Sequence, residues 1–576
     1  MTDTIRPPHV AIATARRTLL AAGAGVAALA LAAGLAGCKP RAPDAGRDAN
    51  ASADTAASAA PAFTVLATTD LKDAQPLEQM VQKATGVNLH FRYGGTMEST
   101  EAVLTGQAGA QAAWFANARY LLSDAQGQAR VKQQDKIMLS PLAVGVSAST
   151  AHELGWDDPA KAAKVTWKTI TQAAGDGTLH YALSNPATSN QGFMALMGVA
   201  AAAADKSEAL AAEDVDRHAI ATFLKGYALP GDNSTYLTEQ FLAKQGPRLN
   251  AFINYESWLT SLNASGKLRE KLVLVYPREG VATADYPMLL LDEARRADYQ
   301  KVVDYLKGRE AQTWLATQTL RRPVDPVAAQ AASAVLPATG VLVELPFSPD
   351  RRLADGLIDA YLNEFRRPIA STFVLDTSGS MNKDRRLERL KEAIDYVAGD
   401  DASLTGRIAR LTSREKIWLE TFSTTPREPV LFEIPAPQAA VKGVAEGADS
   451  AAKKKAMNDV RNFVDSLRAE GGTALYDSIL DALTRMAAEK KAHPDYQYSV
   501  VGFTDGENTD GRDYARFVAD YNALPEDARA IPVFMVLFGD ARESELQGLV
   551  KVTGGRVFDG RTAPLYSVFK DIRAYQ

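Results

Sequence analysis

Apolar residues in the first half of the chain form short runs that alternate with longer segments of mixed polarity. The run Phe63–Ala67 and the alternating stretch Val87–Tyr93 predict strands, with a helix over about 77–84 between them. The same alternation continues to about residue 320. It predicts an α/β domain of two lobes over residues 63–322, with a mostly parallel sheet.

The alternation resumes in the second half after an interruption. Residues 323–366 contain a stretch rich in Ala, Pro and Val and then a helical segment, and we predict a connector here. The runs Ser499–Phe503 and Val533–Phe538 are almost entirely apolar, as expected for parallel strands covered on both faces. A second domain with a doubly wound, Rossmann-like α/β fold is therefore predicted over 367–576.

The first 62 residues follow neither pattern. Positive charge at Arg6 and Arg16-Arg17 precedes an apolar run over 19–36, which is typical of an export signal. Residues 38–62 are mostly Ala, Asp, Ser, Pro and Gly without a large apolar side chain, which predicts a disordered tether. The paired arginines leave open whether export uses the general or the twin-arginine route.

The single cysteine stands at the end of this signal. The segment Leu35-Ala36-Gly37-Cys38 resembles the lipobox of bacterial lipoproteins. The resemblance implies that residues 1–37 are removed, that Cys38 is acylated, and that the protein is anchored in the cell envelope, facing the periplasm or the cell surface. The alternative is a buried apolar helix with an incidental thiol.

Composition narrows the function further. The net charge of −5 argues against nucleic-acid binding, and 46% hydrophobic and 23% charged residues are ordinary for globular domains. The six histidines have no zinc-ligand spacing, and no nucleophile elbow or phosphate loop is present. We therefore predict a binding protein and not an enzyme.

Oxygen-bearing side chains follow two predicted strands of the second domain. Asp376, Ser378 and Ser380 come directly after a strand, Thr473 precedes a helix, and Asp505 follows another strand. Ligands of open α/β sheets bind at the carboxyl ends of the strands. Carboxylates and hydroxyls are hard ligands suited to Mg²⁺, or to another divalent cation such as Mn²⁺ or Ca²⁺.

This pattern resembles the metal-ion-dependent adhesion site of von Willebrand factor A domains, over about residues 368–576. The resemblance implies that Ser378, Ser380 and Thr473 approach the metal directly, whereas Asp376 and Asp505 supply charge, often through water. It also implies that a protein partner completes the metal's shell with an Asp or Glu. The alternative is a simple turn at 376–380.

Residues 63–322 resemble periplasmic solute-binding proteins of the type II class, in which two lobes enclose a cleft. Segments around Tyr93, Trp114, Asn185 and Tyr276 carry this resemblance. The ligand-binding residues we expect are Thr69, Gly95, Thr96, Trp114, Asn117, Ser189 and Asn190. Each has an alternative role, as a helix cap or, for Trp114, as a core aromatic. Ala112-Ala113 replaces an Asp common in such proteins, which leaves the ligand class open.

These features together predict a membrane-anchored extracytoplasmic binding protein. Its second domain would bind a protein partner through Mg²⁺, and its first domain would sense or hold a small molecule. The alternative function is a substrate-binding receptor of a membrane transport system that carries the second domain as an accessory module.

Overall fold

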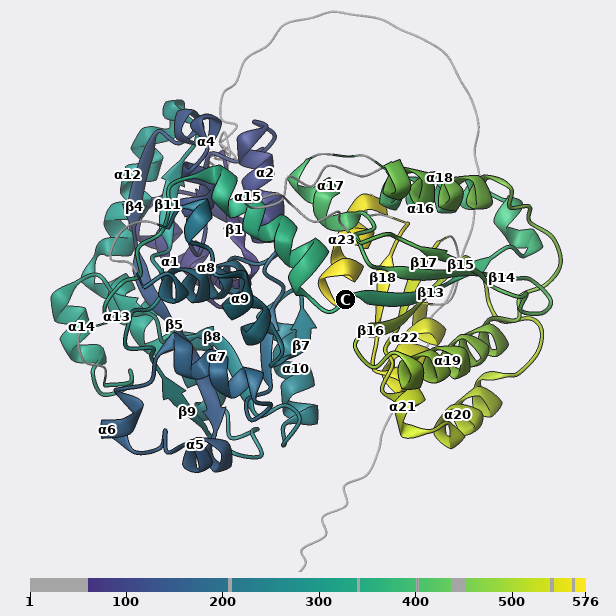
Figure 1. Cartoon of the computed structure of the whole chain (residues 1–576). Coiled ribbons are helices and arrows are strands. Elements are labelled where there is room, and N and C mark those ends of the chain that lie inside the picture. The colour runs from purple at the N-terminus through teal and green to yellow at the C-terminus, as the bar shows by residue number, and fades with distance from the viewer. Residues whose placement is uncertain are drawn as a thin grey trace, which may run out of the picture. The chain divides into compact units, whose positions relative to one another are not determined.

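The computed structural model describes residues 61–205, 210–338, 342–399, 401, 403–436, 451–538, 543–561 and 565–576. The predicted signal, Cys38 and nearly all of the predicted tether lie outside these residues. Among the described residues, no helix combines the length and the apolar character needed to cross a membrane. Figure 1 gives the element labels that are used below.

The first lobe is built on a mixed sheet with strand order β2-β1-β3-β11-β4 in the described part of the chain. β1 runs parallel to β2 and β3, whereas β11 runs antiparallel to β3 and β4. The strands are β1 (Phe63–Thr68), β2 (Leu89–Gly94), β3 (Ala112–Trp114), β4 (Gln133–Lys136) and β11 (Pro287–Leu290). The helices are η1 (Thr69–Ala74), α1 (Leu77–Thr85), α2 (Thr96–Leu104), α3 (Arg119–Leu122), α4 (Ala125–Arg130), η3 (Glu293–Arg295), α12 (Arg296–Lys307) and α13 (Arg309–Gln318).

The second lobe has its own mixed sheet, ordered β10-β5-β8-β6-β7, with β9 and β12 also paired to β5. The strands are β5 (Met138–Ser147), β6 (Tyr181–Ser184), β7 (Tyr227–Gly231), β8 (Ala251–Tyr255), β9 (Leu272–Val275), β10 (Thr283–Ala284) and β12 (Arg322–Pro323). The helices are α5 (Ala148–Leu154), α6 (Pro159–Ala162), α7 (Trp167–Gly175), α8 (Asn190–Ala203), η2 (Ala212–Asp214), α9 (Arg217–Leu224), α10 (Ser234–Lys244) and α11 (Glu256–Ala264). The chain passes between the two sheets at Ile137 and again at Asp285-Tyr286.

The prediction of a mostly parallel sheet in this domain is wrong. β5 is antiparallel to β8, β9, β10 and β12, and only the pairs of β1 and β6 are parallel within the described residues. β5 is buried along nearly its whole length. Antiparallel strands covered on both faces show the same continuous apolar pattern as parallel ones, which explains the error.

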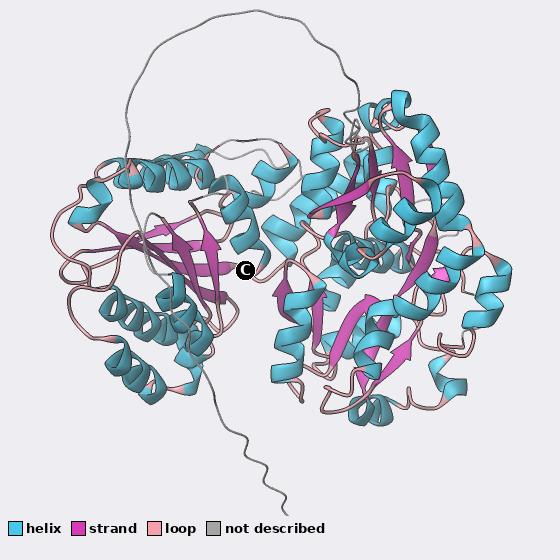
Figure 2. Cartoon of the chain, turned by 180° about the vertical axis from the view of Figure 1, so that it is seen from behind, coloured by secondary structure: helices cyan, strands magenta, loops and turns pink. Residues whose placement is uncertain are grey.

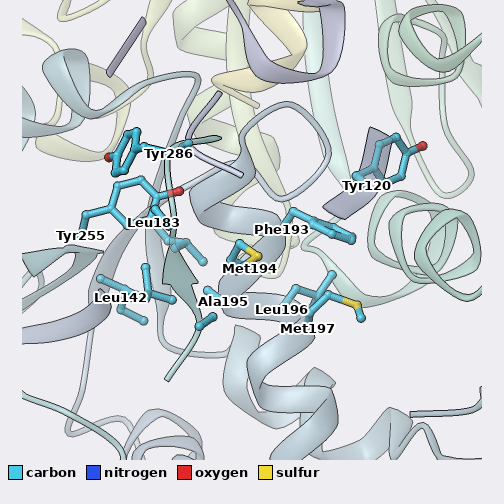
Figure 3. Close-up of a cluster of buried hydrophobic side chains, with 14 of the residues drawn as sticks. Tyr120, Leu142, Leu183, Phe193, Met194, Ala195, Leu196, Met197, Tyr255 and Tyr286 are labelled. Atoms are coloured by element: carbon cyan, nitrogen blue, oxygen red, sulfur yellow. The ribbon is translucent and has the colours of Figure 1, made fainter. Parts of the chain in front are cut away.

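α8 is the central buried helix of this domain. Its sequence is apolar on nearly every face, as expected for a helix without a solvent side. Figure 3 shows Phe193 of this helix directed toward Tyr120, and the two rings meet edge to face with centroids 5.7 Å apart. Tyr255 and Tyr286 lie beyond the opposite side of the helix in the same view.

The predicted connector contains α14 (Pro326–Ala332), α15 (Arg351–Ala360) and a π-helical turn η4 (Tyr361–Phe365). Leu353, Leu357 and Tyr361 belong to the same buried cluster as α8, so this segment contributes to the core of the first domain. The predicted limits of the connector remain a prediction.

Residues 369–576 form the second domain, whose sheet has the strand order β15-β14-β13-β16-β17-β18 in its described part. All neighbours are parallel except β14 and β15. The strands are β13 (Ile369–Asp376), β14 (Lys416–Phe422), β15 (Val430–Glu433), β16 (Gln497–Thr504), β17 (Val533–Leu537) and β18 (Arg556–Asp559). The helices are η5 (Gly379–Asn382), α16 (Arg386–Val397), α17 (Leu404–Ala409), α18 (Ala451–Asp465), α19 (Leu475–Ala492), α20 (Tyr514–Ala523), α21 (Glu526–Arg529), α22 (Glu543–Thr553) and α23 (Leu565–Ala574).

Helices cover both faces of this sheet, as Figure 2 shows. β13 illustrates why: Phe373 and Leu375 belong to one buried cluster and Val374 to another, because successive side chains of a strand point to opposite faces. The nearly continuous apolar strands are thus buried on both sides, as predicted from their composition.

Candidate functional site

The sheet of the second domain has a topological switch point between β13 and β16. The strand order runs outward in both directions from this pair, so the connections that leave the two strands diverge at their carboxyl ends, where open α/β sheets bind ligands. Asp376 is the last residue of β13, and Thr504 is the last residue of β16. Asp505 follows directly, so both predicted carboxylates lie at the carboxyl ends of these strands.

Asp376 is fully buried and held at both carboxylate oxygens. Oδ1 accepts a hydrogen bond of 2.8 Å from the backbone N–H of Ser378, and Oδ2 accepts one of 2.7 Å from the hydroxyl of Thr504. Burial raises the pKa of Asp376 to about 6, although these donors oppose the change. The carboxylate is therefore oriented toward the start of the following loop.

The two serines and Asp505 form a continuous chain of hydrogen bonds. The hydroxyls of Ser378 and Ser380 are 2.9 Å apart, and Ser380 Oγ donates to Asp505 Oδ1 at 2.7 Å. The other oxygen of Asp505, Oδ2, accepts a hydrogen bond of 2.8 Å from Nη1 of Arg386. Residues 125 positions apart in the chain thus share one small polar centre.

Thr473 approaches this centre from the loop before α19. Its backbone N–H donates to Asp510 Oδ2 at 3.0 Å, which fixes the loop. A Cβ placed on Gly506 would lie 3.5 Å from Ser380 Oγ and 3.9 Å from Thr473 Oγ1, so the two hydroxyls stand close to the same glycine. The structure therefore brings together all five side chains predicted as metal ligands.

The donor set is suited to a hard cation. It consists entirely of hydroxyl and carboxylate oxygens, with no sulfur or imidazole. Within the described residues, no group of three or more His, Cys, Asp or Glu side chains gathers as a metal site. A cation at this switch point would therefore depend on the hydroxyls of Ser378, Ser380 and Thr473 as well as on the two carboxylates.

Arg386 was not identified from the sequence, although a signal exists. It lies four residues before Leu390 and eight before Ile394, on the helix face that these residues bury in the core. A charged residue at a core position of an amphipathic helix indicates a buried ionic partner.

A cavity of about 380 Å³ lies at the carboxyl ends of strands from both sheets of the first domain, and Gly555 and Arg556 of the second domain also line it. Five of the predicted ligand-binding residues line it: Thr69, Gly95, Thr96, Ser189 and Asn190. Gly95 and Ser189 are the N-caps of α2 and α8, and neither helix has a side-chain cap. Backbone N–H groups at both helix starts are therefore available to a ligand.

Two predicted ligand-binding residues do not line this cavity. Trp114 is fully buried, and its indole N–H donates to the carbonyl of Tyr286 at 3.0 Å. Asn117 accepts a hydrogen bond of 2.7 Å from the N–H of Arg119 and donates to Asp285, whose pKa burial raises. Trp114 is thus a core aromatic, whereas Asn117 bonds two neighbouring segments and is not the N-cap of α3, which is Ala118.

The cavity also has lining residues that the sequence did not indicate. Asp70, Asp232 and Glu239 contribute carboxylates, Lys72 contributes an amine, and Tyr255 receives a hydrogen bond of 2.8 Å from Asn190. These residues come from segments far apart in the chain, and each is unremarkable in its local sequence. Only folding brings them to one surface.

Comparison with known proteins gives a family match for the first domain. Residues 63–318 match the family of bacterial extracellular solute-binding proteins. No curated protein matches the chain.

Similar solved structures include three binding proteins. The sulfate-binding protein SubI from Mycobacterium tuberculosis H37Rv is 16% identical, covers 49% of this chain and 94% of its own, and has a TM-score of 0.37. The periplasmic binding protein AfuA from Actinobacillus pleuropneumoniae, with fructose-6-phosphate bound, is 12% identical, covers 53% and 98%, and has a TM-score of 0.40. The ferric binding protein from Campylobacter jejuni is 11% identical, covers 52% and 98%, and has a TM-score of 0.39.

The family match covers less than half of the chain and supports an N-terminal solute-binding protein domain, in keeping with the two-lobed α/β fold of these residues. The match also supports an extracytoplasmic ligand-binding role for these residues. The matched residues end before the sheet that carries Asp376 and Asp505.

Proposed function

We propose that this protein is an extracytoplasmic binding protein with two separate binding sites. The first domain holds a small molecule in its cleft. The second domain is a von Willebrand factor A-type domain that holds a divalent cation, Mg²⁺ in the first instance, and thereby binds a carboxylate of a protein partner. Acylation of Cys38 would anchor the protein in the membrane.

The observation that carries the proposal is the hydrogen-bonded set of Ser378, Ser380 and Asp505 at the switch point of the sheet. Asp376 and Asp505 come from adjacent strands, and donors orient the carboxylates before any ligand arrives. Bound Mg²⁺ would supply positive charge and exchangeable coordination positions for a partner's Asp or Glu. The neutral hydroxyls add oxygen ligands without adding negative charge.

Cation binding is tested by calorimetric and thermal-shift titration of the mature protein with Mg²⁺. At a Mg²⁺ concentration one hundred times Kd, binding stabilises the folded state by about 2.7 kcal/mol. For a domain of this size that corresponds to a rise of roughly 5–10 °C in Tm. Asp376→Asn keeps the side-chain shape and should abolish the rise.

Glu388→Gln is the control, because Glu388 is an exposed carboxylate on α16 outside the hydrogen-bonded set of the site. It should retain the Mg²⁺-dependent stabilisation. An equal rise in Tm for Asp376→Asn and the wild type would show that the switch point does not bind the cation.

A receptor role in membrane transport is the second candidate, and the cavity between the lobes favours it. The uncapped starts of α2 and α8 favour a ligand with an anionic group. Inorganic sulfate and fructose 6-phosphate are suitable probes for calorimetry. Asn190→Ala removes the donor to Tyr255 and should weaken binding, whereas Asn117→Ala lies outside the cavity lining and should preserve it.

A further inference from the structure

Arg386 is a buried charge whose position connects it to the proposed cation site. Its side chain is only 8% exposed, at the first residue of α16. Nη1 donates to Asp505 Oδ2 at 2.8 Å, and Nη2 donates to Asp384 Oδ2 at 3.2 Å. Since Asp384 is mostly exposed to solvent, Asp505 is the partner that compensates the buried guanidinium.

The two oxygens of the Asp505 carboxylate have different hydrogen-bond partners. Oδ1 faces the hydroxyls, where it accepts the hydrogen bond from Ser380, and Oδ2 is bonded to Arg386. A fixed positive charge therefore lies directly behind the carboxylate that faces the hydroxyl set. Solvent screens such a charge poorly, because both Arg386 and Asp505 are buried.

We propose that Arg386 is a specificity-determining residue that lowers the intrinsic affinity of the site for a cation and raises the affinity of the loaded site for a carboxylate. The inference rests on the proposed function. Arg386 repels a divalent cation and attracts an incoming anion across the same carboxylate, so its two effects have opposite signs. The site therefore holds the cation more tightly when the partner's carboxylate is bound as well.

The charges near the site support opposite effects of Arg386 on the affinity for the cation and on the affinity for the carboxylate. Asp376 and Asp505 would balance the charge of a divalent cation, and the guanidinium of Arg386 adds positive charge that the exposed Asp384 offsets only in part. Asp510, which holds the backbone of Thr473, adds negative charge nearby. Its contribution is the same whether or not Arg386 is present, so the difference on removing Arg386 reports the guanidinium.

The test compares Arg386→Gln with Arg389→Gln, an exposed arginine on the same helix. Mg²⁺ affinity is measured by competition with a fluorescent chelator, with and without acetate as the model carboxylate. The proteins are purified in Mg²⁺, which supplies the positive charge that Asp505 loses in the variant. We expect Arg386→Gln to lower the Kd for Mg²⁺ about tenfold. We also expect a several-fold smaller enhancement of Mg²⁺ affinity by acetate, while Arg389→Gln resembles the wild type.

A purely structural role would give a different result. If Arg386 only anchors α16, Arg386→Gln would lower Tm while leaving Mg²⁺ affinity and the acetate effect unchanged, or weakening both, and the inference would be overturned. Arg386→Lys retains the charge and should keep Mg²⁺ affinity near the wild-type value. A tenfold tighter Kd in the lysine variant would also overturn the inference.

The proposed function is tested separately in the same experiment. If the wild type and Asp376→Asn both fail to bind Mg²⁺, the cation site itself is refuted, and the inference about Arg386 is refuted with it. If the wild type binds and Asp376→Asn does not, the site stands, and the Arg386 variants decide the inference independently.

Discussion

Glu420 is a buried carboxylate of the second domain whose protonation should make the stability of the protein depend on pH. It lies on β14, two residues after Trp418 and two before Phe422. Both of these residues belong to the apolar cluster on that face of the sheet. Its Oε2 accepts a hydrogen bond of 2.8 Å from Arg485 of α19. Its Oε1 is buried and has no hydrogen-bond partner among the described residues.

Burial is the main reason that the pKa of Glu420 is raised from 4.5 to about 7, with Arg485 opposing the change. One pKa unit corresponds to about 1.4 kcal/mol, so the folded state disfavours the charged form by about 3 kcal/mol. Between pH 4.5 and pH 7 the folded protein binds more protons here than the unfolded chain. Stability from this group is therefore fully present below about pH 4.5 and is lost as the pH rises to about 7.

Glu420→Gln removes the titrating proton and should remove this loss. The difference in free energy of unfolding between variant and wild type, measured by urea unfolding, should shift in favour of the variant by about 3 kcal/mol from pH 4.5 to pH 8. Any effect of the glutamine amide on the free energy of unfolding that does not depend on pH cancels in this comparison.

Asp481→Asn is the control, because Asp481 bonds the same arginine and its side chain is 54% exposed. We expect its effect on stability to change little over the same pH range. A Glu420→Gln difference that does not vary with pH would refute the reasoning that burial in the apolar cluster controls this carboxylate.

Three further substitutions test the packing of the two sites. Gly192→Ala places a Cβ 2.0 Å from the carbonyl oxygen of Ser184 and should lower the free energy of unfolding by about 3 kcal/mol. Gly198→Ala on the same helix makes contacts of only 3.4–3.5 Å and should be tolerated. Thermal unfolding of both variants checks this. Trp114→Phe loses the buried indole hydrogen bond and should cost about 1 kcal/mol in unfolding experiments without changing ligand affinity in the cleft. Gly506→Val places bulk against the hydroxyls near this residue and should eliminate the Mg²⁺-dependent rise in Tm, whereas Gly506→Ala, with its nearest contact at 3.5 Å, should retain it.

The sequence by itself predicted two α/β domains and placed Asp376 and Asp505 at strand ends, whereas cation binding there stays a prediction. Apolar runs such as Ser499–Phe503 predicted strands buried on both faces, and the structure confirms a helix-covered sheet there. The spacing of Asp376, Ser378 and Ser380 after a strand placed their oxygens at the carboxyl end of the sheet, because strand ends dictate where such side chains emerge. These inferences succeeded because they depend on local periodicity and on residues close together in the chain.

Only the tertiary structure decided features that depend on distant partners. Strand direction around β5 could not be predicted, because a strand's side-chain pattern is the same in either direction. Trp114 could not be assigned to core or cleft until its indole was seen bonded to Tyr286, and Arg386 became meaningful only opposite Asp505. Burial and electrostatic pairing depend on where the whole chain folds, so the charge balance of the candidate site was settled by residues more than one hundred positions apart.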